Sequence, residues 1–145
     1  MSTFEDLITT YSTTVRFRDL DPLGHVNNAV YMTWMEESRV SYLLRWGLVT
    51  EVSDIDFVIA HAEIDFQSPA FAREAIDVKV VATRLGNKSF ELRYKITADG
   101  RPCASGMSVA VPFDPQLGKA KVLPDNWRKT MEQQVQAYTA SGEVW

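Results

Sequence analysis

The chain is organised around Asp19-Leu-Asp-Pro-Leu-Gly-His-Val-Asn-Asn28, which joins a predicted strand to a long, aromatic-rich predicted helix. Before it, residues 11–18 are rich in β-branched side chains and alternate, with Val15 and Phe17 facing one way, which predicts a first strand. After it, apolar residues recur at helical spacing from Asn28 to Trp46 and predict a helix. The polar residues at this junction are the candidates for an active site.

The rest of the chain predicts a sheet that packs on this helix. Four alternating runs predict strands at Phe57–Phe66, Glu74–Leu85, Lys88–Ala98 and Pro102–Phe113. Gly86-Asn87 and Asp99-Gly100 suit tight hairpins, so the last three strands are expected to form an antiparallel meander. Pro124 to Tyr138 predicts a short C-terminal helix. This order of elements predicts an α+β domain in which a helix packs on an antiparallel sheet.

The composition is that of an ordinary globular protein. The 145 residues suffice for one domain, and no repeat or linker divides residues 1–145. A net charge of −4 argues against nucleic acid as a partner. A single cysteine, an acidic N-terminus and the lack of a long apolar run predict a cytoplasmic protein with no membrane span.

Two interpretations of the junction stay open, one structural and one chemical. Asp21-Pro-Leu-Gly24 has the residues of a type I turn, and Asn27 or Asn28 suits a helix N-cap. Alternatively, the turn holds the Asp21 carboxylate beside the helix N-terminus, where backbone N–H groups can stabilise an oxyanion. The carboxylate would then attack a carbonyl carbon or deprotonate a water.

Other chemistries are disfavoured. The chain has no G-x-S-x-G motif, and Cys103 falls in the middle of a predicted strand, so a serine or cysteine hydrolase is not expected. A metal site is not expected either, because the spacing of its candidate ligands, Asp19, Asp21 and His25, matches no recurrent metal loop. A second polar set on one strand face suits a polar sheet surface or a dimer contact better than a ligand set; it consists of His61, Glu63 and Asp65. We expect neither a metal nor a cofactor.

Two runs carry a family resemblance: Val15-Arg-Phe-Arg-Asp-Leu-Asp-Pro-Leu-Gly-His-Val-Asn-Asn-Ala-Val-Tyr31 and, after it, Glu36-Glu-Ser-Arg39. They resemble the hotdog-fold acyl-CoA thioesterases of the 4-hydroxybenzoyl-CoA thioesterase family. Ile64-Asp-Phe-Gln-Ser-Pro69 resembles the ending of that family's second strand, and the likeness covers about residues 11–115. It implies a five-stranded antiparallel β-sheet wrapped around one long central helix. It also implies a homodimer joined edge to edge through its sheets, or a homotetramer.

The same resemblance implies roles for residues of the junction. The protein would hydrolyse an acyl-CoA, or an acyl group on acyl carrier protein, to a free acid. Asp21 matches the catalytic nucleophile or general base, and the N–H of Asn28 matches the oxyanion donor. Gly24 would let the turn pass close to the thioester. His25 and Asn27 would position water or the thioester, or would serve only the turn and the cap.

Substrate-binding residues are expected on the helix, the second strand and a hairpin: Tyr31, Trp34, His61, Phe66, Ser68, Arg84, Asn87 and Lys88. The region from His61 to Ser68 would come from the second subunit. Lys and Arg side chains at turns, including Arg101, would meet the phosphates of CoA. Two alternatives stay open: a non-catalytic module that binds acyl-CoA or acyl carrier protein, and a hotdog dehydratase or hydratase.

Overall fold

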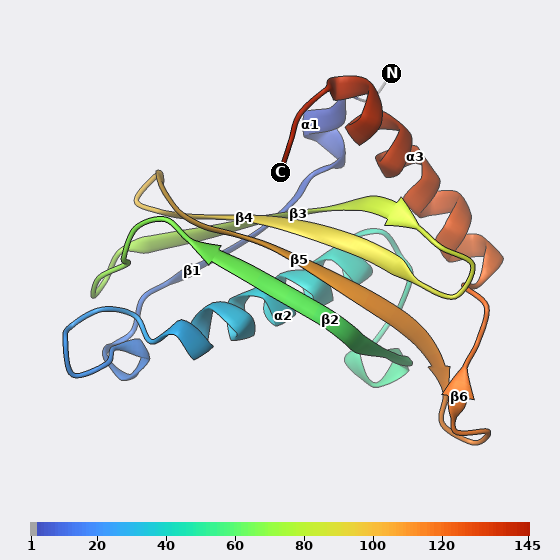
Figure 1. The fold of residues 1–145 in the computed structure, drawn as a ribbon, viewed down its shortest axis with the longest axis horizontal. Helices are drawn as coiled ribbons and strands as arrows, with labels where there is room; N and C mark the ends of the chain where they lie inside the picture. Colours follow the sequence, from blue (N-terminus) through green and yellow to red (C-terminus); the bar gives the residue numbers. More distant parts are fainter. Residues whose placement is uncertain (1–2) are drawn as a thin grey trace.

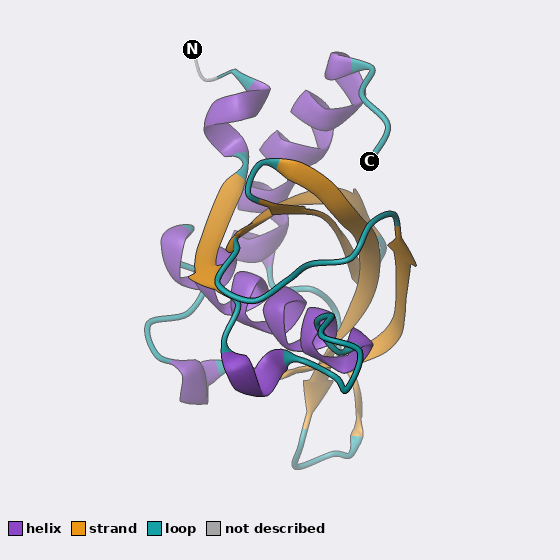
Figure 2. Cartoon of the chain, turned by 90° about the vertical axis from the view of Figure 1, so that its left-hand side faces the viewer, coloured by secondary structure: helices purple, strands orange, loops and turns teal. Residues whose placement is uncertain are grey.

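The computed structural model describes residues 3–145 and shows a curled sheet wrapped around a long helix (Figures 1 and 2). The elements are α1 (Phe4–Leu7), β1 (Thr9–Thr14), the 3-10 turn η1 (Phe17–Asp19), α2 (Asn28–Arg45), the 3-10 turn η2 (Val52–Asp54), β2 (Phe57–Phe66), β3 (Ala75–Leu85), β4 (Phe90–Ala98), β5 (Arg101–Asp114), β6 (Lys119–Ala120) and α3 (Asp125–Ser141). The main strands lie in the order β1-β3-β4-β5-β2, all antiparallel, and the two-residue β6 pairs with β5. The predicted α+β architecture is confirmed, with β6 as an addition.

Helix α2 lies inside the curl of the sheet (Figure 2) because one side of it is almost entirely buried. Its buried apolar residues are Tyr31, Trp34, Met35, Tyr42 and Leu43. Gly106 of β5 lets the sheet approach the helix closely, because a Cβ atom at this position would lie 3.1 Å from the Met35 sulfur. The long helix predicted from Asn28 is therefore confirmed as the centre of the core.

The first strand differs from the prediction. It ends at Thr14, and the chain then enters η1, in which Phe17 is 89% exposed whereas Val15 is 2% exposed. The cause is local, because the Asp19 carboxylate accepts a hydrogen bond of 2.8 Å from the Arg16 N–H and closes the turn. The prediction that Val15 and Phe17 share a strand face is therefore wrong.

Helix α3 closes the end of the sheet at which β3 turns into β4 (Figure 1). Its Trp127 is buried and donates from Nε1 to the Leu48 carbonyl at 3.1 Å. Gln134 is fully buried, and its Oε1 accepts bonds from the Tyr42 hydroxyl at 2.6 Å and from the Ala82 N–H at 3.2 Å. Since β1 pairs with β3 only as far as Val80, Gln134 supplies the acceptor that the next part of β3 lacks.

Among the described residues, no helix combines the length and the apolar character needed to cross a bilayer.

Candidate active site

The turn before α2 has the predicted geometry. The Gly24 N–H donates to the Asp21 carbonyl at 3.0 Å, as in a type I turn, and Gly24 adopts φ +82°, a left-handed conformation that favours glycine. Asp21 Oδ1 accepts bonds from the N–H groups of Leu23 at 2.9 Å and His25 at 3.2 Å. The backbone N–H of Asp21 in turn donates to the His25 carbonyl at 2.7 Å.

These bonds orient the Asp21 carboxylate and leave one of its two oxygens unbonded. Only Oδ1 is held by the turn, while Oδ2 has no hydrogen-bond partner among residues 3–145. The side chain is half-buried and lines a cavity. The structural and chemical interpretations of the turn are thus compatible, since one oxygen shapes the loop and the other is available.

Asp19 and Asn27 support the junction. Asp19 is 4% exposed, and its carbonyl accepts a bond of 2.8 Å from the Asn27 N–H. Asn27 is the N-cap of α2, because its Oδ1 accepts a bond of 2.9 Å from the Ala29 N–H. Both residues therefore fasten the start of the helix to the turn.

A cavity of about 270 Å³ collects residues from the turn, from α2 and from the end of β2. Its lining consists of Asp21, His25, Val26, Asn28, Tyr31, Phe66, Gln67, Ser68 and Pro69. Six of these were predicted as site residues, whereas Val26, Gln67 and Pro69 were not singled out. The Asn28 N–H, at the first helical position, has no acceptor among the described residues. A carboxylate oxygen and a backbone donor thus share one cavity, an arrangement suited to acyl transfer.

Aromatic rings form one side of this cavity. The Tyr31 ring lies 5.1 Å from the Trp34 ring and 5.0 Å from the Phe66 ring, in edge-to-face geometry. The His25 ring packs edge-on against Phe71, with 5.4 Å between centroids. Burial raises the pKa of Tyr31, so its phenol is neutral at physiological pH. Trp34 is 3% exposed and supports Tyr31 without lining the cavity.

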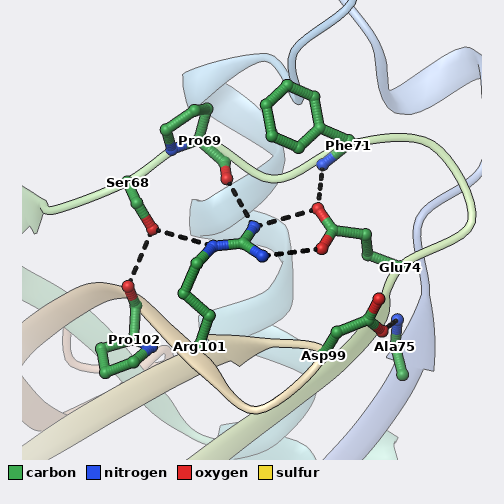
Figure 3. Close-up of polar contacts among 8 residues, drawn as sticks. All are labelled: Ser68, Pro69, Phe71, Glu74, Ala75, Asp99, Arg101 and Pro102. Carbon is green, nitrogen blue, oxygen red and sulfur yellow. Dashed lines mark hydrogen bonds and ion pairs between the residues drawn. The ribbon is translucent and has the colours of Figure 1, made fainter.

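Arg101 holds the loop that carries Ser68 and Pro69 (Figure 3). Its guanidinium forms two bonds to the Glu74 carboxylate, of 3.0 and 3.1 Å, and donates to the Pro69 carbonyl at 2.9 Å. The bond with Arg101 lowers the pKa of Glu74, and the Phe71 N–H also donates to this carboxylate, at 2.7 Å. Arg101 is therefore engaged in a loop clamp, a role that its position in a turn did not reveal.

The remaining predicted residues lie away from this cavity within one chain. Gly24 and Asn27 belong to the turn and the cap and do not line the cavity. His61 is exposed on β2, with Nε2 2.9 Å from Glu63 Oε1. Three predicted phosphate ligands lie at the opposite end of the sheet from the cavity, on β3 or in the β3–β4 hairpin: Arg84, Asn87 and Lys88.

The residues that could support other chemistries are not arranged for them. Cys103 is buried, and burial raises the pKa of its thiol to about 11, which keeps it in the unreactive protonated form. Among residues 3–145, no group of three or more His, Cys, Asp or Glu side chains is placed to hold a metal ion.

Several proteins with similar sequences or structures are named as thioesterases or acyl-CoA hydrolases. The model of the thioesterase-like superfamily matches residues 15–134. The long-chain acyl-CoA thioesterase FadM of Escherichia coli is 30% identical over 128 residues, which are 83% of this chain and 95% of that protein. The 1,4-dihydroxy-2-naphthoyl-CoA hydrolase of Nostoc punctiforme is 27% identical, over 83% of this chain and 86% of that protein. A Thermus thermophilus thioesterase complexed with coenzyme A and Zn superposes with a TM-score of 0.79 at 34% identity, over 88% of this chain and 94% of that one.

Proposed function

This chain belongs to the thioesterase-like superfamily, and on that premise we propose that it hydrolyses acyl-CoA thioesters with Asp21 as the catalytic carboxylate. The fold is the predicted hotdog fold, shared with solved thioesterases, and the enzyme class is thioester hydrolase. One observation carries the assignment of Asp21: its free oxygen and the unpaired Asn28 N–H line the same cavity.

The proposed reaction uses these two groups together. The thioester carbonyl oxygen accepts a hydrogen bond from the Asn28 N–H, which stabilises the negative charge of the tetrahedral intermediate. Asp21 Oδ2 either removes a proton from a water that attacks the carbonyl carbon, or attacks that carbon itself to form a mixed anhydride that water then hydrolyses. When the C–S bond breaks, CoA leaves as a thiolate that takes up a proton, and the acyl group ends as a carboxylic acid. His25, at the cavity wall, would help to orient the water or the thioester.

We propose a homodimer formed through β2. This strand is an edge of the sheet, and among residues 3–145 no other strand pairs with its outer side. It exposes large apolar side chains, with Val58 47%, Ile59 36% and Phe66 48% exposed. Unpaired backbone groups together with apolar side chains favour pairing with another strand. Size-exclusion chromatography with light scattering tests this, and Ile59→Lys should shift the mass toward the monomer.

Such a dimer would bring the three distant predicted phosphate ligands close to the site. In an antiparallel β2–β2 pair, the start of β2 in one copy lies beside the end of β2 in the other. The β3–β4 hairpin of the second copy, with Arg84, Asn87 and Lys88, then lies at the same end as the first copy's cavity. There these side chains would meet the phosphates of CoA. His61, near the middle of β2, would lie at the contact between the two copies, whereas Ser68 lines the cavity of its own chain.

Thiol release from a panel of short, long and aromatic acyl-CoAs tests the proposed function. Asp21→Asn should lower kcat by about a hundredfold or more, because general-base catalysis contributes at least that factor. Asp77→Asn is the matched control, since Asp77 lies on β3 and bonds to Ser12. Unchanged kcat in Asp21→Asn would overturn the role of Asp21.

Tight binding of acyl-CoA by the wild type without thiol release would indicate a binding module, and double-bond chemistry would indicate a dehydratase or hydratase. A cytoplasmic location stays a prediction, and acyl carrier protein stays an alternative to CoA as the carrier of the acyl group.

A further inference from the structure

Arg39 is a buried cation without an anionic partner. Its side chain projects from α2 beneath the sheet, and the residue is 7% exposed. Among residues 3–145, its guanidinium makes one hydrogen bond, from Nη1 to the Tyr94 hydroxyl at 3.3 Å, and no carboxylate lies within 4.0 Å of it. A guanidinium keeps its charge in proteins and has five N–H donors to satisfy.

The neighbours of Arg39 do not neutralise it. The Tyr94 hydroxyl lies 2.7 Å from Ser108 Oγ, so this phenol is shared between two polar groups. Burial raises the pKa of Tyr94, which keeps the phenol neutral. A buried charge is costly unless it is paired, and native structures rarely leave one uncompensated. The remaining donors of Arg39 have no protein acceptor among residues 3–145, so they are free to bind an acceptor on a ligand.

A second cavity, of about 290 Å³, adjoins this guanidinium. It lies between α2, the η2 segment and the start of β2, and its lining consists of Glu36, Arg39, Val40, Leu43, Val52, Ile55, Phe57 and Ile59. Apart from Arg39 and the exposed Glu36, the lining is apolar. Such a cavity suits the hydrocarbon part of a ligand that ends in a group able to meet Arg39.

The second cavity is lined by the same helix and the same strand as the candidate active site. Asn28, Met32, Arg39 and Leu43 fall on one side of α2, and β2 contributes to both cavities. From Asn28 to Arg39 the helix rises about 16 Å, and long helical side chains lean toward the N-terminus, which shortens this gap. In the proposed dimer the start of β2 also lies beside the second copy's active site. An acyl group that extends along α2 from the site of its own chain, or across the dimer contact from the second copy's site, would approach Arg39.

We propose that this cavity receives the far end of the acyl group and that Arg39 binds a carboxylate carried there. The inference rests on the proposed function and names its substrate class: acyl-CoAs whose acyl group bears a second, remote carboxylate. A carboxylate supplies the missing negative charge and accepts two parallel N–H bonds from a guanidinium. A methyl end leaves Arg39 uncompensated, and a hydroxyl end offers one neutral acceptor. Glu36 opposes the incoming charge weakly, because it is exposed to screening solvent.

The test compares kcat/KM for three acyl-CoAs of equal length that end in a carboxylate, a hydroxyl or a methyl group. Wild type should prefer the carboxylate-ended substrate over the methyl-ended one by about tenfold or more, since hydrogen bonds between charged groups are stronger than those between neutral groups. Arg39→Met should abolish the preference, and Arg39→Lys should restore part of it. Arg45→Met is the matched control, because Arg45 lies on the same helix and donates to the carbonyls of Asp6 and Ile8.

Each other outcome has a defined meaning. If Arg39→Met lowers kcat/KM equally for all three substrates, Arg39 has a structural role and the inference is overturned. Equal kcat/KM values of the wild type for the three substrates would also overturn it. A preference for the hydroxyl end that depends on Arg39 overturns the carboxylate assignment. If Arg39→Met does not fold, the test is the thermal stabilisation of wild type and of Arg39→Lys by the free dicarboxylic acid and the free monocarboxylic acid. Wild type should be stabilised more by the dicarboxylic acid, and equal stabilisation of wild type by the two acids would contradict the proposal. Absent hydrolysis of every substrate by wild type would instead overturn the proposed function.

Discussion

At the end of the sheet where β2 finishes and β3 begins, a cavity is left open and reactive groups face it: Asp21 keeps a free carboxylate oxygen and Asn28 a free N–H. At the opposite end, α3 packs Trp127, Met131 and Gln134 against the sheet. Chemistry needs polar groups that folding leaves unsatisfied, whereas stability needs them paired and the space filled. Large buried side chains are thus concentrated under α3, whereas an available carboxylate oxygen and an available N–H lie at the turn.

Removing the largest side chain of the closed end should separate stability from activity most clearly. Trp127 packs on Phe57 and Phe90, with ring centroids 6.3 and 5.8 Å away, and bonds to Leu48. Trp127→Ala should lower the free energy of unfolding by about 3–5 kcal/mol, measured by urea denaturation. The folded fraction should keep the wild-type kcat, and a strong loss of kcat in that fraction would show that the two ends are coupled.

Gln134→Ala probes the same end through hydrogen bonds. It leaves the Tyr42 hydroxyl and the Ala82 N–H buried without their acceptor, so we expect a loss of about 1–3 kcal/mol in the free energy of unfolding. Gln133→Ala is the matched control, because Gln133 is the exposed neighbour on α3. Equal denaturation midpoints for the two variants would show that Gln134 does not support the closed end.

Most of the fold could be predicted because alternation and turn residues agree with the packing. The predicted bounds of β2 are those observed, and β4 alternates between buried and half-buried residues as expected. Prediction failed at Phe17, where a local bond between Asp19 and Arg16 overrides a pattern rich in β-branched residues. Alternation alone does not reveal a carboxylate that closes a turn.

The site could be predicted only where its parts are close in sequence. The turn at Asp21 and the cap at Asn27 depend on bonds between residues two to four positions apart. The Arg101 clamp joins residues 27 to 33 positions apart, and Arg39 reaches Tyr94 across 55 positions. Helical periodicity indicates which side of α2 is apolar, but it cannot show that a cation on that side lacks a counter-ion.

A smaller effect is expected from Gly24→Ala, which tests how firmly the turn must hold Asp21. No atom lies within 4 Å of the added Cβ, so the cost, about 1 kcal/mol, comes from φ +82° alone. Gly142→Ala imposes a similar cost at the C-cap of α3, where φ is +70° and space is also open. Both variants should lose similar stability by urea denaturation, but only Gly24→Ala should lower kcat. Equal kcat values would indicate that Asp21 tolerates a displaced turn.

The smallest change is expected from the Glu74–Arg101 clamp at the open end, and it should depend on pH. The bond with Arg101 lowers the pKa of Glu74, so the carboxylate stabilises the folded state above its unfolded pKa of about 4.3, and this contribution is lost as the pH falls through the lower folded value. Glu74→Gln should therefore be less stable than wild type at neutral pH, and the difference should shrink in acid. Glu37→Gln, at an exposed helix position, is the control. A difference in unfolding free energy that stays constant from neutral to acidic pH would show that packing, and not charge, holds the loop of Ser68 in place.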